Sequence, residues 1–274
     1  MSFVPAIPVS GLAGFKVLER NYDQQYTVFS KDPTLQREIA YFKDNISNVK
    51  NAADLVSDYR LMKVTLGAFG LSHDINSKYF IEKVLREGTT DENAFANKLT
   101  DRRYRRLAEA FGFDKPNASQ PLNNTTINSI VQNYQTRSFE AAVGQTQPAM
   151  ETALAFKREI GALVDGSTNE AARWFNIMGQ TQLRKVIESA LGLPSDVGKL
   201  DIDQQHGIFA DRFERRYQAK VGDLSDPKLA DKVVRDYLLK DQIANGIADY
   251  SPASTALTIL QNGFGSGSLL SSRY

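Results

Sequence analysis

The chain has 274 residues, 42% of them hydrophobic, which is enough for a substantial core and excludes wholesale disorder. Its 33 basic and 32 acidic side chains nearly cancel, so the net charge does not indicate nucleic acid or an anionic membrane as the partner. There is no cysteine, which excludes disulfides, thiolate catalysis and cysteine-ligated metal sites.

The N-terminal part of the chain is not typical of a membrane or Sec-targeting segment. No run of about 18 apolar residues is present, so we expect no membrane-spanning helix. The first residues, MSFVPAIPVSGLAGF, lack a basic n-region and contain Pro5 and Pro8. We expect residues 1–14 to be a mobile segment, and the protein to be cytoplasmic or exported to its destination without a Sec signal.

Apolar residues at helical spacing begin near Phe15 and predict a first helical half over residues 15–113. Capping residues predict where helices begin inside this half, because a side-chain oxygen there can accept the free backbone N–H groups. Four such starts are predicted: Asp32-Pro33, Asn51 for a helix that runs to Gly70, Asp74, and the capping box from Thr89 to Glu92 for a helix through Phe95 and Leu99.

Residues 114–124, DKPNASQPLNN, contain two prolines and three asparagines and predict a linker. A second helical half is expected over residues 125–246, with starts at Ser167–Glu170 and Asp226-Pro227, and residues 247–274 are expected to form a C-terminal helix and a flexible Gly/Ser tail. No segment alternates as a strand would. The predicted fold class is therefore all-α, with roughly ten to twelve helices.

Two stretches 122 residues apart carry the same pattern. RLMKVTLGAFGLSHDI begins at Arg60 and QLRKVIESALGLPSDV begins at Gln182, and 7 of their 16 positions are identical, where average composition gives roughly one match by chance. The shared residues are an apolar helical stripe, a glycine and a following aspartate, so the pattern carries packing. We interpret it as an internal duplication that relates the two helical halves and builds a rigid scaffold.

The usual constellations of catalysis and metal binding are missing from the sequence. The histidines, His73 and His206, stand in no metal-ligand spacing, and no phosphate-binding loop or nucleophile elbow is present. Close carboxylates such as Asp201 and Asp203 stand where helices begin, and capping accounts for them. We therefore expect no cofactor, no metal and no catalytic residue, although two carboxylates could still face each other across a cleft.

Two basic clusters are the strongest candidates for a functional surface. DRRYRR spans Asp101–Arg106, and the related DRFERR spans Asp211–Arg216 at an offset of 110. Because a helix turns by about 100° per residue, these arginines cannot share one face, and nearby acids can pair with some of them. We expect a protein-binding patch or a salt-bridged face, and no nucleic acid. The candidate interaction patch consists of Arg102, Arg103, Tyr104, Arg105, Arg106, Arg212, Arg215 and Arg216.

Three longer stretches resemble a known family. They are GLAGFKVLERNYDQQ, DYRLMKVTLGAFGLSHDINSKYFIEKVLREGTTDENAFANKLTDRRYRRLAEAFGF and WFNIMGQTQLRKVIESALGLPSDVGKLDIDQQ. Over about residues 10–262 the chain is similar to a domain-of-unknown-function family of alphaproteobacteria that is often encoded among flagellar genes. The resemblance implies a helical fold, no established activity and an association with the bacterial flagellum.

These observations favour a non-enzymatic structural or interaction protein of the flagellum, whether a component, an assembly factor or an export-linked protein. Its expected partners are flagellar or other proteins, and a homo-oligomer stays open. Two alternatives also stay open: an enzyme with an unrecognised carboxylate site, such as one that cleaves peptidoglycan, and a nucleic-acid or regulatory binder that uses the arginine-rich helix.

Overall fold

The computed structural model describes residues 3–115, 122–167 and 169–249, and these residues form helices and no strand. Fourteen α-helices are present among them, twelve of which have seven or more residues. The predicted all-α class is confirmed. None of the described helices is both long enough and apolar enough to cross a bilayer. The predicted C-terminal helix and tail lie outside the described residues from residue 250 on.

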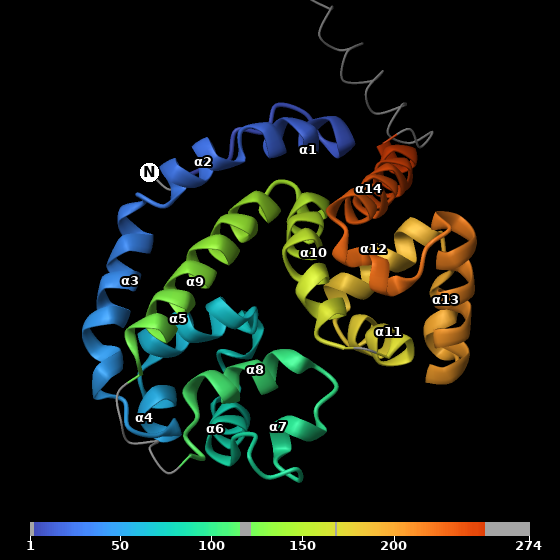
Figure 1. The fold of residues 1–274 in the computed structure, drawn as a ribbon. Coiled ribbons are helices and arrows are strands. Elements are labelled where there is room, and N and C mark those ends of the chain that lie inside the picture. Colours follow the sequence, from blue (N-terminus) through green and yellow to red (C-terminus); the bar gives the residue numbers. More distant parts are fainter. Residues whose placement is uncertain (1–2, 116–121, 168, 250–274) are drawn as a thin grey trace, which may run out of the picture.

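Figure 1 shows the helices in chain order. Those before residue 115 are α1 Gly11–Arg20, α2 Tyr22–Phe29, α3 Pro33–Asn45, α4 Ala52–Ser57, α5 Tyr59–Phe69, α6 Lys78–Glu87, α7 Phe95–Lys98 and α8 Arg102–Phe111. Those after residue 122 are α9 Asn124–Gly144, α10 Pro148–Asp165, α11 Glu170–Met178, α12 Thr181–Leu191, α13 Ile202–Tyr217 and α14 Pro227–Asp249. Short 3-10 helices are η1 Ile46–Asn48, η2 Ser72–Asp74, η3 Ser195–Lys199 and η4 Val221–Ser225.

Helices α9 and α10 follow one another at the centre of the fold and contact each other (Figure 1). Helix α5 packs beside α9, and α3 contacts both of them. On the other side, α12 and α14 pack against α10, α11 contacts both α10 and α12, and α13 packs against α11 and α12. Helix α1 contacts α14 and α10, so the first and last described helices are neighbours.

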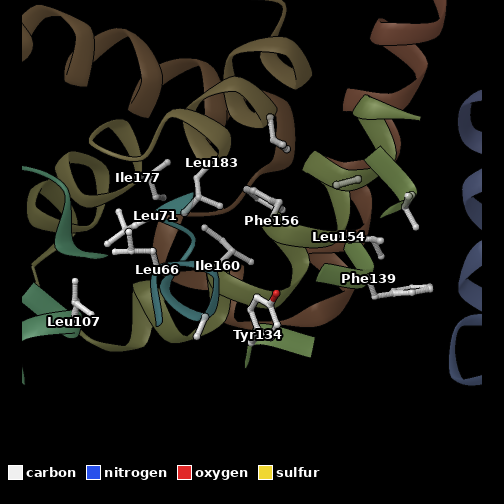
Figure 2. Packing of buried hydrophobic residues seen from close by; sticks show 14 of the residues in the cluster. Leu66, Leu71, Leu107, Tyr134, Phe139, Leu154, Phe156, Ile160, Ile177 and Leu183 are labelled. Atoms are coloured by element: carbon white, nitrogen blue, oxygen red, sulfur yellow. The ribbon is translucent and has the colours of Figure 1, made fainter. Parts of the chain in front are cut away.

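The hydrophobic core is continuous across the two predicted halves. Figure 2 shows Leu66 of α5 and Leu107 of α8 in the same cluster as Tyr134 of α9, Ile160 of α10 and Leu183 of α12. All five side chains are buried. Because apolar burial is the main favourable term in folding, the two halves stabilise each other. The boundary between them stays a prediction.

Residues at the N-terminus pack against the rest of the fold from Phe3 onward, although we expected residues 1–14 to be mobile. The ring of Phe3 lies 5.4 Å from that of Phe29, edge to face. The side-chain amide of Gln25 accepts from the backbone N–H of Ala6 at 2.8 Å and donates to its carbonyl at 3.3 Å. Helix α1 also begins within this segment.

Several predicted helix ends are confirmed. Asp32 accepts from the backbone N–H groups of Thr34 at 2.8 Å and Leu35 at 3.2 Å, with proline in the first turn of α3. Asp226 accepts from the backbone N–H of Lys228 at 2.9 Å where α14 begins. Asp201 accepts from Asp203 at the start of α13. The sequence predicts these helix starts because each capping hydrogen bond joins residues two or three positions apart.

The two repeated stretches form the same local unit. Gly70 and Gly192 end α5 and α12 in the left-handed region, with φ of 73° and 64°. The following residue then donates back into the last turn in both cases, from Leu71 N–H to the Leu66 carbonyl at 2.8 Å and from Leu193 N–H to Glu188 at 2.9 Å. A 3-10 helix follows each one. The wider duplication of the halves stays a prediction.

Asn51 caps a helix as predicted, because its side chain accepts from the backbone N–H of Asp54 at 2.9 Å. That helix does not continue to Gly70, however: it ends at Ser57, and the Asp58 carboxylate accepts from the N–H groups of Arg60 and Leu61 and starts α5. Two other predicted helix starts are wrong. The box at Thr89 starts no helix, because Asp114 accepts from the N–H of Thr89 and of Thr90 and holds a turn, and α7 begins only at Phe95. Asp74, finally, does not cap the next helix.

The last correction concerns the start of α11. Asn169, rather than Ser167 of the predicted capping box, accepts from the N–H groups of Ala171 at 2.8 Å and Ala172 at 3.4 Å. Asparagine and serine are comparable N-caps, so sequence alone does not choose between candidates two residues apart.

Candidate functional site

The arginine cluster of α8 is divided between the interior and the surface. Arg103 points inward, where its guanidinium donates to the Asp101 carboxylate at 2.6 Å and to the Gly70 carbonyl at 2.5 Å. Beside it, the Tyr104 hydroxyl donates to Asp74 at 2.8 Å. Burial raises the pKa of Tyr104, and the Asp74 carboxylate raises it further. These two residues join α8 to the end of α5 and do not form a docking surface.

The other arginines of α8 lie closer to solvent. Arg105 pairs with Glu109 at 2.8 Å, and Arg106 approaches Glu159 at 3.8 Å. Arg102 is exposed and forms no ion pair with any residue that the structure describes. Of the four arginines of DRRYRR, Arg102 therefore has the most freely available charge.

The second cluster, on α13, is divided in the same way. Arg215 pairs with Asp211 at 2.8 Å, and Arg216 pairs with Asp236 of α14 at 2.8 Å. Burial and Asp236 raise the pKa of Tyr217 to about 12. Arg212 is exposed and unpaired within the described part of the chain. Figure 1 shows α8 and α13 in different parts of the molecule, so the eight predicted residues do not form one patch.

The similarity between DRRYRR and DRFERR does not mark equivalent positions. Asp101 is the N-cap of α8 and accepts from the backbone N–H of Arg103 at 2.9 Å. Asp211 lies inside α13, which begins at Ile202. The first motif therefore stands at the start of α8, whereas the second lies within α13.

Sequence reasoning missed a network of ion pairs between α9 and α10. Arg137 donates to Glu159 at 2.7 Å and to the Ala68 carbonyl at 3.0 Å. Arg158 binds Glu140 through two parallel hydrogen bonds of 2.7 and 2.8 Å and also donates to Glu159 at 2.9 Å. The Glu159 side chain is only 8% exposed. Two arginines and two glutamates thus neutralise one another beneath the surface.

Electrostatics within this network follow from its geometry. Burial alone would raise the pKa of Glu159, but Arg137, Arg158 and Arg106 together hold it below its ordinary value. Burial lowers the pKa of Arg137 in spite of the carboxylate of Glu159. Glu159 is therefore the common acceptor that holds several cations together.

A pocket of about 210 Å³ adjoins this network, and its walls come from α5, η2, α9, α10 and α12. Arg137, Glu140 and Arg158 form part of the wall, so the ion network closes one side. Most of the residues that line the pocket have polar side chains, although apolar atoms form the larger part of its exposed wall. Its remaining lining is Gly67, Gly70, Ser72, His73, Ala141, Glu151, Ala155 and Gln182.

Glu151 differs from the other acids of the pocket because no described residue donates a hydrogen bond to its carboxylate or forms an ion pair with it. Its side chain is half-buried and lies against Gly144, where an added Cβ would be 1.8 Å from a carboxylate oxygen. Burial raises the pKa of Glu151; the Glu140 carboxylate adds to this, and His73 opposes it.

Neither histidine occupies a metal-binding arrangement in the described residues, where no group of three or more His, Asp or Glu side chains could hold an ion. His73 is exposed at the rim of the pocket in η2. His206 packs against Phe175 with ring centroids 5.4 Å apart. The sequence did not predict the pocket. Its only signal was the presence of charged residues, Glu140 and Glu159, at core-facing positions of their helices.

Comparison with known proteins gives two matches. A family model described as "Protein of unknown function (DUF1217)" matches residues 68–230, more than half of the chain. The X-ray crystal structure of a protein from Agrobacterium tumefaciens, a structural-genomics target, is 25% identical in sequence, with a TM-score of 0.69 over 88% of this chain and 99% of that one. No curated protein matches the chain. The chain belongs to the DUF1217 family of proteins of unknown function.

Proposed function

We propose that this protein is a non-enzymatic structural or interaction protein of the bacterial flagellum, as a component, an assembly factor or an export-linked protein. The observation that carries the proposal is the resemblance of three long motifs, in order along the chain, to a family often encoded among flagellar genes. Membership of the DUF1217 family agrees with that resemblance but assigns no activity.

The distribution of charge supports binding to other proteins. Most of the predicted arginines are engaged by acids of the same chain, which leaves Arg102 on α8 and Arg212 on α13 as exposed, unpaired cations among the described residues. Charges at the edge of an interface mainly steer association and select partners. We infer that these two side chains are the parts of the predicted patch that a partner protein contacts.

One observation favours a second candidate, an enzyme with a carboxylate site. Glu140 and Glu151 line the same pocket. Glu140, however, already accepts two hydrogen bonds from Arg158 and is 6% exposed, so it is poorly placed to exchange protons with a substrate. A peptidoglycan-cleavage assay of the wild type and of Glu151→Gln tests this candidate, and equal, absent cleavage by both would exclude it.

The nucleic-acid alternative loses support from the same geometry. A nucleic-acid surface needs several free cations close together, whereas Arg103 is held by Asp101 and Arg105 by Glu109. A gel shift at low salt with the wild type and with Arg102→Ala tests this alternative. We expect no shift for either protein.

The flagellar proposal is tested by deleting the gene in the source bacterium and measuring swimming and the number of complete flagella by electron microscopy. We expect impaired motility that the wild-type gene restores. Normal swimming with complete flagella in the deletion strain would refute the proposal.

The role of the exposed arginines is tested by complementation with Arg102→Glu and Arg212→Glu. Arg20→Glu, on α1, is the matched control, because Arg20 is also an exposed arginine without a described ion-pair partner. We expect weaker rescue by the first two variants and full rescue by the control. In parallel, crosslinking of each variant in cells should recover rod, hook or export proteins with the wild type and the control, and fewer with the charge reversals.

A further inference from the structure

We propose that the polar pocket beside the α9–α10 ion network binds a small organic cation, a primary ammonium or guanidinium group, through the carboxylate of Glu151. This site is independent of any flagellar role. Its volume of about 210 Å³ is below the roughly 300–1,000 Å³ of pockets for drug-sized ligands. It therefore fits a small molecule or the end of one long side chain.

The charged side chains that line the pocket determine whether a ligand should be a cation or an anion. Arg137 and Arg158 have their guanidinium groups engaged by Glu159 and Glu140 at 2.7–2.9 Å, so an anion would have to displace those carboxylates. The acid that remains without a partner in the described residues is Glu151. The Glu151 carboxylate is half-buried and has no donor among the described residues, so water is its remaining hydrogen-bond partner. A bound cation would replace that water with a charged donor of opposite sign.

Two exposed neutral polar residues line the same pocket as Glu151. The hydroxyl of Ser72 and the side-chain amide of Gln182 line the pocket, and neither makes a hydrogen bond within the described residues. They belong to η2 and α12, whereas Glu151 belongs to α10. A ligand with several N–H donors would find one charged and two neutral acceptors there, which suits an ammonium or a guanidinium group.

The first turn of α10 accounts for an acid at position 151, because carboxylates are favoured near helix N-termini. It does not account for the pocket or for the unengaged groups of η2 and α12. A divalent metal ion fits poorly, since Ca²⁺ takes roughly six to eight oxygen ligands and the described residues hold no cluster of three potential ligands. The pocket chemistry therefore points to an organic monocation.

The test uses the full-length chain with butylammonium chloride and methylguanidinium chloride as probes, sodium chloride at equal ionic strength as the salt control, and sodium butyrate as the anionic counterpart. Thermal unfolding is followed as each probe is titrated. We expect a saturable rise in Tm with at least one organic cation and none with sodium chloride or butyrate. A rise with butyrate alone, or no saturable response to either cation, would overturn the proposal.

Glu151→Gln keeps the size of the side chain and removes its charge, and it should weaken binding by about tenfold or more, the usual effect of losing a hydrogen bond to a charged group. Glu92→Gln is the matched control, because Glu92 is an exposed glutamate without a described ion-pair partner, and it should bind as the wild type does. Equal affinity of Glu151→Gln and wild type would refute the role of Glu151.

A second readout does not depend on a variant. In a two-dimensional NMR titration of the wild type, the backbone amides of Ser72, Gly144 and Gln182 should shift with the same saturation curve as the Tm change. Shifts confined to other parts of the molecule would place the cation elsewhere and contradict the proposal.

Discussion

Replacing Glu159 with glutamine should destabilise the fold more than any other single isosteric change of a charged residue in the α9–α10 ion network. Glu159 accepts from Arg137 at 2.7 Å and from Arg158 at 2.9 Å, and Arg106 lies 3.8 Å away. The glutamine keeps the shape of the side chain but leaves these cations without a shared negative charge. Removing one partner of a buried ion pair costs about 3–5 kcal/mol.

The expected loss is near the lower end of that range, about 3 kcal/mol, because the amide oxygen of glutamine can still accept from one arginine and the arginines keep some solvent contact. Glu109→Gln is the matched control: Glu109 pairs with Arg105 at 2.8 Å, but both side chains are 43% exposed. An exposed helical pair of this kind contributes about 0.3–0.5 kcal/mol.

The same reasoning predicts how stability depends on pH. The arginines hold the pKa of Glu159 below its ordinary value of 4.5, so the unfolded chain takes up this proton first as the pH falls. The contribution of the ionised Glu159 carboxylate to the free energy of unfolding is therefore complete above about pH 4.5. It is lost as the pH falls from there through the pKa of Glu159 in the folded protein. The glutamine variant should lack this part of the acid sensitivity.

Urea unfolding at neutral pH, followed by circular dichroism, measures the free energy of unfolding for the three proteins, and repeated measurements down to acidic pH test the linkage. The reasoning is refuted if Glu159→Gln unfolds within about 1 kcal/mol of the wild type, or no more readily than Glu109→Gln, because the buried network would then contribute little.

Further substitutions test a helix end, the interior of α10, the core and an N-cap. Gly70→Ala should lower the free energy of unfolding by about 1–2 kcal/mol, because φ is 73° and the new Cβ would lie 2.6 Å from Arg137; Gly161→Ala, whose Cβ meets nothing within 4 Å, should instead stabilise α10 by up to about 1 kcal/mol. Trp174→Ala should cost about 3–5 kcal/mol, because its side chain is 2% exposed; a loss below 1 kcal/mol in urea would contradict this packing. Asp58→Ala should cost about 1 kcal/mol as α5 loses its N-cap, whereas Asp58→Asn should retain most of it, and equal losses would show that capping is not the cause.

The helical class and several helix ends were predictable because they depend on neighbours in sequence. Asp32 and Gly70 act within four residues of their own positions, through capping and through a left-handed helix end. The break at Asp58 was missed because apolar residues continue at helical spacing on both sides of it, which hides a cap that is itself local. The Tyr41 hydroxyl, from a different helix, also donates to the Asp58 carboxylate at 2.7 Å. The first residue of α5, Tyr59, is 56% exposed.

The polar pocket was beyond prediction for a different reason. Glu140 lies three residues before the buried Val143 on α9, and Glu159 lies three residues after the buried Phe156 on α10, so both acids fall on the buried side of their helices. An acidic residue on an apolar helix face indicates a buried ion pair. The sequence alone does not identify the arginine in each pair, because Glu140 and Arg158 are 18 residues apart and Glu159 and Arg137 are 22 residues apart.

The seating of α1 against α14 and the shared core have a practical consequence for expression. The family match runs over residues 68–230, so it starts near the end of α5 and stops in the first turns of α14. A protein truncated to those limits would lose α1 to α4 and most of α5, and it would also lose most of α14, which packs against α10 and α12. Recombinant fragments should therefore retain the residues before 68 and after 230, since the region that matches the family model is shorter than the part of the chain that shares one hydrophobic core.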